Sequence, residues 1–153
     1  MKIEKAQIED MPDILKLQKL AYQSEAKLYS DFTISPLTQT LEEIKDEFNN
    51  KIFLKAVVNE KIIGSVRASF IKEGTCYIER LIVHPDFQNQ GIGTKLMNEI
   101  EDTFKDAEKY ELFTGHKSKR NLYLYQKLGY KMFKTEEINN NLKFIYLIKS
   151  NKI

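Results

Sequence analysis

The sequence holds a single cysteine, Cys76, among its 153 residues. One cysteine cannot form an internal disulfide, so a packed core has to hold the fold, and a reducing compartment is compatible with it. Recognisable zinc-ligand spacing is also missing, because the two histidines, His84 and His116, are far apart in the chain and stand alone. We therefore expect no metal site.

Glycine and proline are few, and long apolar runs are missing. With only 6 Gly and 3 Pro against 42% hydrophobic residues, the composition excludes collagen-like, low-complexity and disordered classes. The longest apolar run, at 144–148, has about five residues, far short of the ~20 that cross a bilayer. The first ten residues carry acids and no apolar signal-peptide core. We expect a cytoplasmic protein that has no membrane partner.

Neither sign of charge dominates, since 24 basic and 22 acidic side chains leave a formal net charge of +2. This balance weighs against nucleic acid as a partner. The short basic run at 117–120 fits better as a clamp on phosphates or as a solvated helix start. At 153 residues the chain has the usual size of one domain, so we predict a single domain over residues 1–153.

Apolar spacing and turn residues predict an α/β fold. Alternating residues mark the strands and one-sided apolar spacing marks the helices. The predicted strands are 2–7, 52–58, 61–70, 75–83, 111–114, 130–134 and 142–148. The first predicted helix begins at Pro12, and three further helices cover about 41–49, 95–104 and 119–128. Asp10 is the predicted N-cap of the first helix, and Thr40 with Glu43 form a capping box. This order predicts an α/β sandwich, with one mixed, mostly antiparallel sheet of six to seven strands and helices on both faces.

A loop with Gly91 and Gly93 links the strand at 75–83 to the next helix. The unpaired N–H groups and positive dipole end of a helix N-terminus bind phosphate-like anions, and glycine lets the backbone approach closely. A glycine-rich turn without a ligand is the alternative. A Rossmann fingerprint is excluded because Leu96 stands where its third glycine belongs, and a P-loop is excluded because Gly-Lys-Ser/Thr is missing.

Gln88, Gly91 and Gly93 resemble the Gln/Arg-x-x-Gly-x-Gly/Ala signature of the GNAT superfamily of acyl-CoA-dependent N-acetyltransferases. The preceding residues 81–85 resemble the family's Leu-x-Val-His-Pro segment, and residues 122–130 (LYLYQKLGY) resemble its Tyr-Glu-Lys-Leu-Gly-Phe helix end. The resemblance covers nearly the whole chain in element order and is specific over about 75–135. It implies a GNAT-like sandwich.

The resemblance implies acetyl-CoA as the cosubstrate. In the family the sheet opens after the strand equivalent to 75–83, and main-chain groups bind pantetheine and diphosphate. The implied contacts are Leu81, Ile82, Val83, Gln88, Asn89, Gln90, Gly91, Ile92, Gly93 and Thr94. The family's pantetheine-binding asparagine, seven residues before the motif tyrosine, is replaced by Ser118, and Asn121 lies one helical turn later. Either can serve, and Ser118 also fits as the N-cap of the helix.

The implied reaction is direct attack on acetyl-CoA by a primary amine of a small molecule or peptide. The N–H of Leu81 would polarise the thioester carbonyl, and Tyr125 stands at the family's general-acid position. Glu79 is the candidate base, because strand alternation places it on one face with Leu81 and Val83. The alternatives are that Glu79 pairs with a cation and that Tyr125 is a core aromatic residue.

The predicted helix at 41–48 carries two like-charged i,i+4 pairs, Glu42 with Asp46 and Glu43 with Glu47. Such a surface attracts a cationic acceptor, and the alternative is a solvated acidic face without a ligand. A second function fits the same motifs: a non-catalytic CoA-binding sensor or partner module of this fold. The chain is expected to be a monomer or a homodimer.

Overall fold

The computed structural model describes residues 1–151. Its strands are β1 (Lys2–Lys5), β2 (Ile52–Val58), β3 (Lys61–Lys72), β4 (Thr75–Val83), β5 (Lys109–Gly115), β6 (Lys131–Glu137) and β7 (Lys143–Ser150). Its α-helices are α1 (Met11–Ala21), α2 (Gln23–Tyr29), α3 (Ser35–Thr38), α4 (Leu41–Phe48), α5 (Ile92–Thr103) and α6 (Lys119–Lys127). Short 3-10 turns cover Ile8–Asp10 and Pro85–Phe87.

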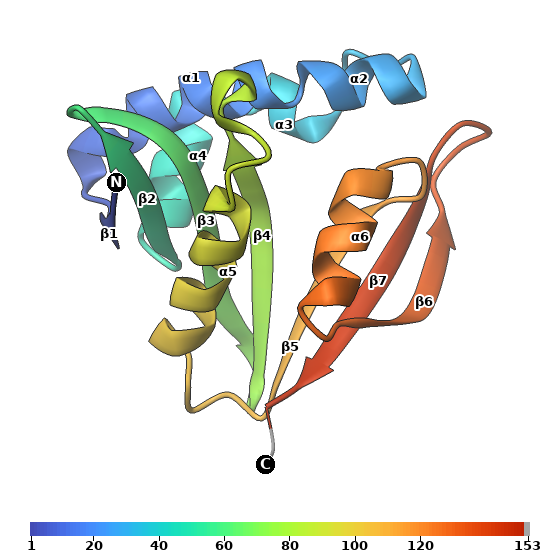
Figure 1. Ribbon diagram of the computed structural model, residues 1–153. Coiled ribbons are helices and arrows are strands. Elements are labelled where there is room, and N and C mark those ends of the chain that lie inside the picture. Colours follow the sequence, from blue (N-terminus) through green and yellow to red (C-terminus); the bar gives the residue numbers. More distant parts are fainter. Residues whose placement is uncertain (152–153) are drawn as a thin grey trace.

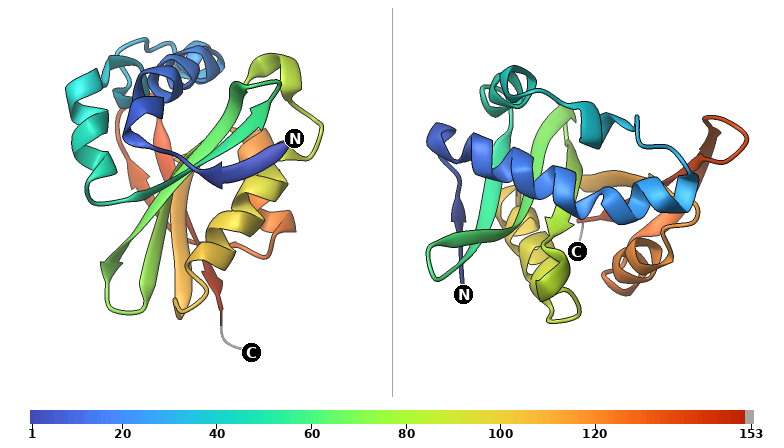
Figure 2. Two further views of the ribbon diagram at one scale, coloured as in Figure 1. Left: turned by 90° about the vertical axis from the view of Figure 1, so that its left-hand side faces the viewer. Right: turned by 90° about the horizontal axis from the view of Figure 1, so that it is seen from above.

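The strands form one seven-stranded sheet in the order β1-β2-β3-β4-β5-β7-β6. Only the neighbours β4 and β5 are parallel among the described strands. Helices α5 and α6 lie on one side of the sheet and α4 on the other, while α1 and α2 run across the top (Figures 1 and 2). The predicted α/β sandwich with a mixed, mostly antiparallel sheet is confirmed.

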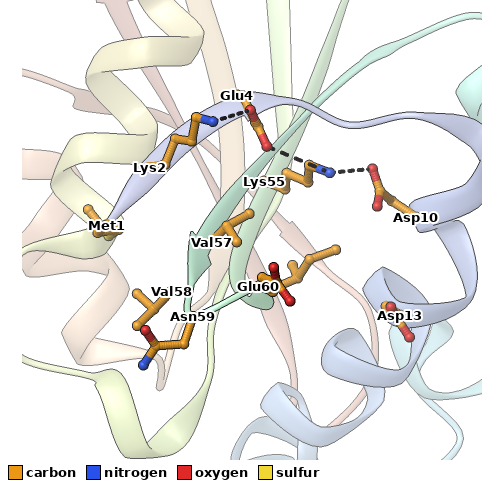
Figure 3. Close-up of a pocket in the computed structure, with 11 residues that line it drawn as sticks. Met1, Lys2, Glu4, Asp10, Asp13, Lys55, Val57, Val58, Asn59 and Glu60 are labelled. Carbon is orange, nitrogen blue, oxygen red and sulfur yellow. Dashed lines mark hydrogen bonds and ion pairs between the residues drawn. The ribbon is translucent and has the colours of Figure 1, made fainter.

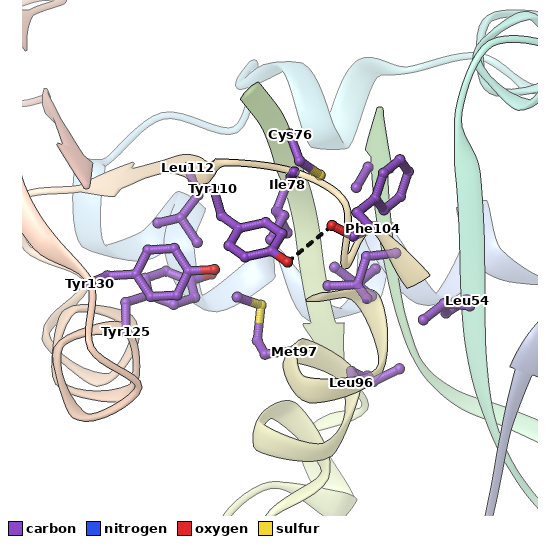
Figure 4. Packing of buried hydrophobic residues seen from close by; sticks show 14 of the residues in the cluster. Leu54, Cys76, Ile78, Leu96, Met97, Phe104, Tyr110, Leu112, Tyr125 and Tyr130 are labelled. Carbon is purple, nitrogen blue, oxygen red and sulfur yellow. Dashed lines mark hydrogen bonds between the residues drawn. The ribbon is translucent and has the colours of Figure 1, made fainter. Parts of the chain in front are cut away.

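Two apolar clusters hold the layers together. The larger lies between the sheet and α5, where the Tyr110 hydroxyl donates to the Phe104 carbonyl at 3.0 Å (Figure 4). The smaller joins α1 and α4 to β2 through fully buried residues such as Ile14 and Ile44. Burying each such side chain stabilises the fold by roughly 1.5–3 kcal/mol. Cys76 belongs to the larger cluster, and burial raises the pKa of its thiol to about 12, as suits an unreactive core residue.

The predicted capping box of α4 is confirmed, because Glu43 N–H donates to Thr40 Oγ1 at 3.1 Å and Thr40 N–H donates to the Glu43 carboxylate at 2.8 Å. The predicted N-cap position of α1 is confirmed, because Asp10 directly precedes the helix. The Asp10 carboxylate makes no capping bond to α1, but accepts the N–H of Gln7 at 2.7 Å and the ammonium of Lys55 at 2.8 Å. It therefore closes the preceding 3-10 turn and ties that turn to β2.

Helices α2 and α3 were absent from the predicted element order. Only Ala26 and Tyr29 of α2 are buried, so its sequence has no clear apolar period. Helix α5 also begins earlier than predicted, at Ile92, because Gly91 takes a left-handed conformation and starts the helix there. No helix in residues 1–151 combines the length and apolar content needed to cross a membrane.

The turn between β2 and β3 offers a test of local strain. Its two residues, Asn59 and Glu60, have φ of 49° and 65°, as a type I′ turn requires, and this region costs a non-glycine residue about 1 kcal/mol. Glycine relieves this strain but loses more chain entropy on folding. The net effect of Glu60→Gly should be a rise in the free energy of unfolding of about 0.5 kcal/mol, measured by urea denaturation. The control Glu73→Gly, at a position without positive φ, should give no gain, and a loss for Glu60→Gly contradicts the expectation.

Candidate active site

The pairing between β4 and β5 ends early, and this defines the site. The parallel ladder runs only from Thr75–Lys109 to Tyr77–Glu111. Beyond it β4 pairs with β3 alone and β5 with β7 alone, and Figure 1 shows the two strands diverging. We call the region between residues 78–83 of β4 and 112–115 of β5 the β4–β5 opening. Backbone groups on its inner edges lack a strand partner, so they are available to an extended ligand.

A β-bulge in β4 lies at this opening. Arg80 has a φ of 53°, and the register with β3 shifts so that Arg80 and Leu81 face Val66 alone. An extra residue reverses the alternation of side chains. Leu81 and Val83 therefore pack against the cluster on the α5 side, whereas Glu79 lies on the opposite face. The prediction that Glu79 shares a face with these two residues is wrong for this reason.

The loop at 88–94 carries an uninterrupted run of available N–H groups. None of the seven backbone N–H groups of residues 88–94 donates a well-formed hydrogen bond within the described chain. Gly91 has a φ of 79°, and a Cβ added there would meet no atom within 4 Å. The Gln88 side-chain oxygen accepts a hydrogen bond from the guanidinium of Arg120. The loop thus offers main-chain donors, a helix dipole and a nearby cation, which together fit a diphosphate.

Tyr125 is 6% exposed and lies on α6, with its ring 6.0 Å from that of Tyr130. Burial raises the pKa of its hydroxyl well above the ordinary range, and the neighbouring Tyr22 and Glu25 raise that pKa further. The phenol therefore stays protonated at neutral pH and keeps a proton to donate. Its role as an acid stays a prediction.

Ser118 is buried and already has two partners. Its hydroxyl donates to the Glu25 carboxylate at 2.5 Å and lies 2.9 Å from the Tyr29 hydroxyl, which accepts the N–H of Lys117 at 2.9 Å. Ser118 stands at the N-cap position of α6, as that interpretation expects, but its side chain makes no capping bond. Asn121, one turn later, donates only to Thr114, at 3.3 Å.

Glu25 is a candidate site residue that the sequence did not predict. It lies with Tyr29 on α2, which crosses above α6 (Figure 1). The only sequence signal is the spacing of Tyr22, Glu25 and Tyr29, which places all three on one helical face. That spacing does not predict that the face contacts Lys117 and Ser118, about 90 positions later in the chain.

Glu79 ends a chain of alternating charges. Lys51 Nζ lies 2.6 Å from Glu79 Oε2 and 2.8 Å from Glu47 Oε1, and Glu47 Oε2 lies 3.3 Å from the guanidinium of Arg67. The Arg67 side chain is fully buried, lies 4.5 Å from the centre of the Phe53 ring and donates to Gln18 at 2.5 Å. The alternative that Glu79 pairs with a cation is thus confirmed, and its role as a base stays a prediction. Repulsion between Glu43 and Glu47 is offset by these partners.

A surface hollow lies elsewhere. It measures about 590 Å³ and is lined mainly by β1 and β2 (Figure 3). Four of its charged side chains form ion pairs, because Lys55 lies 2.8 Å from Asp10 and 3.9 Å from Glu4, and Lys2 lies 3.5 Å from Glu4. This hollow holds none of the predicted site residues.

The fold and the loop define an α/β protein with available N–H groups at a helix N-terminus beside an unpaired strand edge, an arrangement that suits an anion. A sequence model of the acetyltransferase (GNAT) family matches residues 12–130. The chain belongs to this family.

The chain is also similar to one curated protein, and it shares its fold with solved structures. The UPF0157 protein YqkA of Bacillus subtilis is 29% identical over 125 residues, which are 80% of this chain and 35% of that protein. The chain thus spans about a third of that relative's length. The ribosomal-protein-S18-alanine N-acetyltransferase of Escherichia coli superimposes with a TM-score of 0.81, 13% identity and coverage of 99% and 94%. PaiA N-acetyltransferase of Thermoplasma acidophilum in complex with coenzyme A superimposes with a TM-score of 0.78 and 18% identity. The match covers 98% of this chain and 99% of that one.

The buried charges predict how stability depends on pH. Burial alone would raise the pKa of Glu47, but the hydrogen bond from Lys51 and the charge of Arg67 outweigh it and lower that pKa. As the pH falls, the Glu47 carboxylate therefore becomes protonated at a higher pH in the unfolded chain than in the folded protein. The stabilisation is complete above the unfolded-state pKa of about 4.3 and is lost as pH falls through the lower folded-state value.

Glu47→Gln should cost about 3 kcal/mol at pH 7, because it leaves the buried Arg67 without its counter-charge. The difference from wild type should shrink towards pH 3. Urea unfolding at several pH values measures both effects. Glu42→Gln, on an exposed site of the same helix, is the control and should change stability by less than about 0.5 kcal/mol. A pH-independent difference for Glu47→Gln contradicts the expectation.

Proposed function

We propose that the protein transfers the acetyl group of acetyl-CoA directly to a primary amine of a small molecule or peptide. The observation that carries this proposal is a run of seven backbone N–H groups, at residues 88–94, that donate no hydrogen bond within the described chain. This run lies next to the unpaired edge of β4. Membership of the acetyltransferase family supports it.

The residues present suit acetyl-CoA along its length. The diphosphate is assigned to the N–H groups of residues 88–94, with Arg120 close by. The pantetheine arm is assigned to the unpaired edge of Leu81, Ile82 and Val83, with Asn121 or Ser118 as a further contact. This places the thioester beside the bulge, between the N–H of Leu81 and the hydroxyl of Tyr125.

The main-chain N–H of Leu81 then stabilises the oxyanion that forms when the amine attacks the thioester carbon. One such donor contributes roughly 3 kcal/mol to the transition state. Tyr125, kept neutral by burial, donates its proton to the leaving sulfur. Because phenols are weaker acids than thiols, the tyrosine must recover a proton at once, and the protonated amide nitrogen supplies it.

The acceptor has to lose a proton before it attacks. An alkylamine with a pKa of about 10.4 is neutral in only about one part in 2,500 at pH 7, which costs roughly 4.6 kcal/mol. A carboxylate near the opening can take that proton. Glu79 is the base predicted from the sequence, although Lys51 lies 2.6 Å from its carboxylate.

A cationic acceptor is favoured by exposed acids of α4 such as Glu42 and Asp46. The cytoplasmic location, the single-domain organisation, the lack of a nucleic-acid or membrane partner, and the monomeric or homodimeric state stay predictions from the sequence.

Gly91→Val tests the anion loop. A β-branched residue at a φ of 79° is strained, so the loop should rearrange and its N–H groups should lose their common direction. We expect the Kd for acetyl-CoA to rise at least about tenfold, equivalent to about 1.4 kcal/mol, by calorimetry at low salt. If the wild-type protein shows no affinity for acetyl-CoA or CoA, the proposed function is wrong.

Tyr125→Phe tests the acid. Removing the hydroxyl should lower kcat about 100-fold, while the Kd for acetyl-CoA stays within about threefold. Thiol release across a panel of primary amines gives the rates. Full activity of this variant over the whole pH range rules out the assigned role. Binding of acetyl-CoA by wild type without thiol release from any amine favours the non-catalytic CoA-binding module.

A further inference from the structure

We propose that Glu25, on α2, binds the ammonium group of the acceptor at the β4–β5 opening and takes its proton. This inference rests on the proposed acetyl transfer and assigns that step to a residue outside the family motifs. Glu79 then has a structural role, as the end of the charge network of Arg67, Glu47 and Lys51.

The first support is the contact between α2 and α6. Glu25 Oε2 accepts the Ser118 hydroxyl at 2.5 Å. Ser118 and Tyr125 are seven residues apart, nearly two helical turns, so they lie on the same face of α6. Side chains of a helix tilt towards its N-terminus, which directs the Tyr125 hydroxyl towards the Ser118 end. The Glu25 carboxylate therefore lies above the hydroxyl that is assigned to the leaving sulfur.

The second support is the contact of Arg80, in the bulge, with Tyr22, which lies between α1 and α2, and with Ser35 of α3. The Arg80 guanidinium lies 6.0 Å from the centre of the Tyr22 ring and donates to Ser35 Oγ at 2.8 Å. Arg80 directly precedes Leu81, whose N–H is assigned to the thioester oxygen. Tyr22 and Glu25 are three residues apart and share a helical face. They cover the place where the thioester and the amine have to meet.

The third support is the state of the two carboxylates. Glu25 is half-buried and accepts one hydrogen bond from a neutral hydroxyl, while its Oε1 accepts none within the described residues. Glu79 instead lies against the Lys51 ammonium. Glu79 Oε2 is therefore already occupied by the ammonium of Lys51. Glu79 also lies on the face of the sheet opposite Leu81.

Several ionisable groups surround Glu25. The titratable side chains that interact with its charge are Tyr22 and Tyr29 from the α2 region and Tyr125 on α6. The charged and titratable groups next to these are His116 and Lys117, whose side chains lie near the Tyr29 ring, and Arg80, whose guanidinium lies near the Tyr22 ring.

The step balances in atoms and charge. The ammonium gives one proton to Glu25, the amine nitrogen bonds to the thioester carbon, and the carbonyl electron pair moves to the oxygen beside Leu81 N–H. When the C–S bond breaks, the sulfur takes the Tyr125 proton, and Tyr125 recovers one from the new amide nitrogen. Glu25 passes its proton to water, so one proton is released for each acetyl group.

Glu25→Gln is the decisive variant, because its amide oxygen can still accept the Ser118 hydrogen bond but cannot take a proton. We expect kcat/KM to fall at least about 100-fold at pH 7. The acidic limb of the pH profile, which is the fall in rate towards low pH, should move up to the pKa of the amine, because only the neutral amine then reacts. The Kd for acetyl-CoA and the melting temperature should stay close to wild type. Glu25→Asp should keep the acidic limb with a lower rate.

Two comparison variants separate the roles. Tyr29→Phe removes the hydroxyl shared with Ser118 and leaves the Glu25 carboxylate, so the acidic limb should remain. Glu79→Gln should lower the free energy of unfolding and keep the limb. If Glu25→Gln retains kcat/KM within about threefold, or if the acidic limb moves to the pKa of the amine in Glu79→Gln instead, the proposal is wrong. A wild type that binds acetyl-CoA but releases no thiol with any amine overturns the proposed function itself.

Discussion

The rest of the site depends on the early end of the parallel pairing between β4 and β5. Each strand is held on its outer side, β4 by β3 and β5 by β7, as far as Val83 and Gly115. Their inner edges have no partner beyond Tyr77 and Glu111. Main-chain groups in such a position need hydrogen bonds from elsewhere. The sheet therefore provides a strand-like binding surface without any side chain that is specific for the ligand.

The charge network supports this opening from the opposite face. A fully buried guanidinium stabilises a fold only when it is well paired, and Arg67 on β3 is paired with Glu47 of α4 and Gln18 of α1. Lys51 extends the network to Glu79, one residue before the bulge. Helices α1 and α4 are thus fixed to the sheet, and α1 in turn holds α2 above α6.

Local signals made most of the fold predictable, and long-range contacts explain what was missed. The turn at Gly74 and the capping box at Thr40 act over a few residues, so β4 and α4 were predicted with nearly correct bounds. The bulge has no glycine to reveal it, because Arg80 adopts the left-handed conformation, and this reversed the assigned face of Glu79. Helix α2 is held by Tyr29, whose ring fills the space where a Cβ of Gly115 would lie.

The departure from the family pattern at Ser118 now has a physical explanation. Ser118 is 3% exposed, and its one hydroxyl proton is used by Glu25. The longer side chain of an asparagine would displace Glu25 or Tyr29 from this buried contact. Asn121 has two amide protons and uses one of them, in a long bond of 3.3 Å to Thr114. Of the two predicted pantetheine contacts, Asn121 is therefore the one with a donor to spare, and the serine serves the contact between α2 and α6.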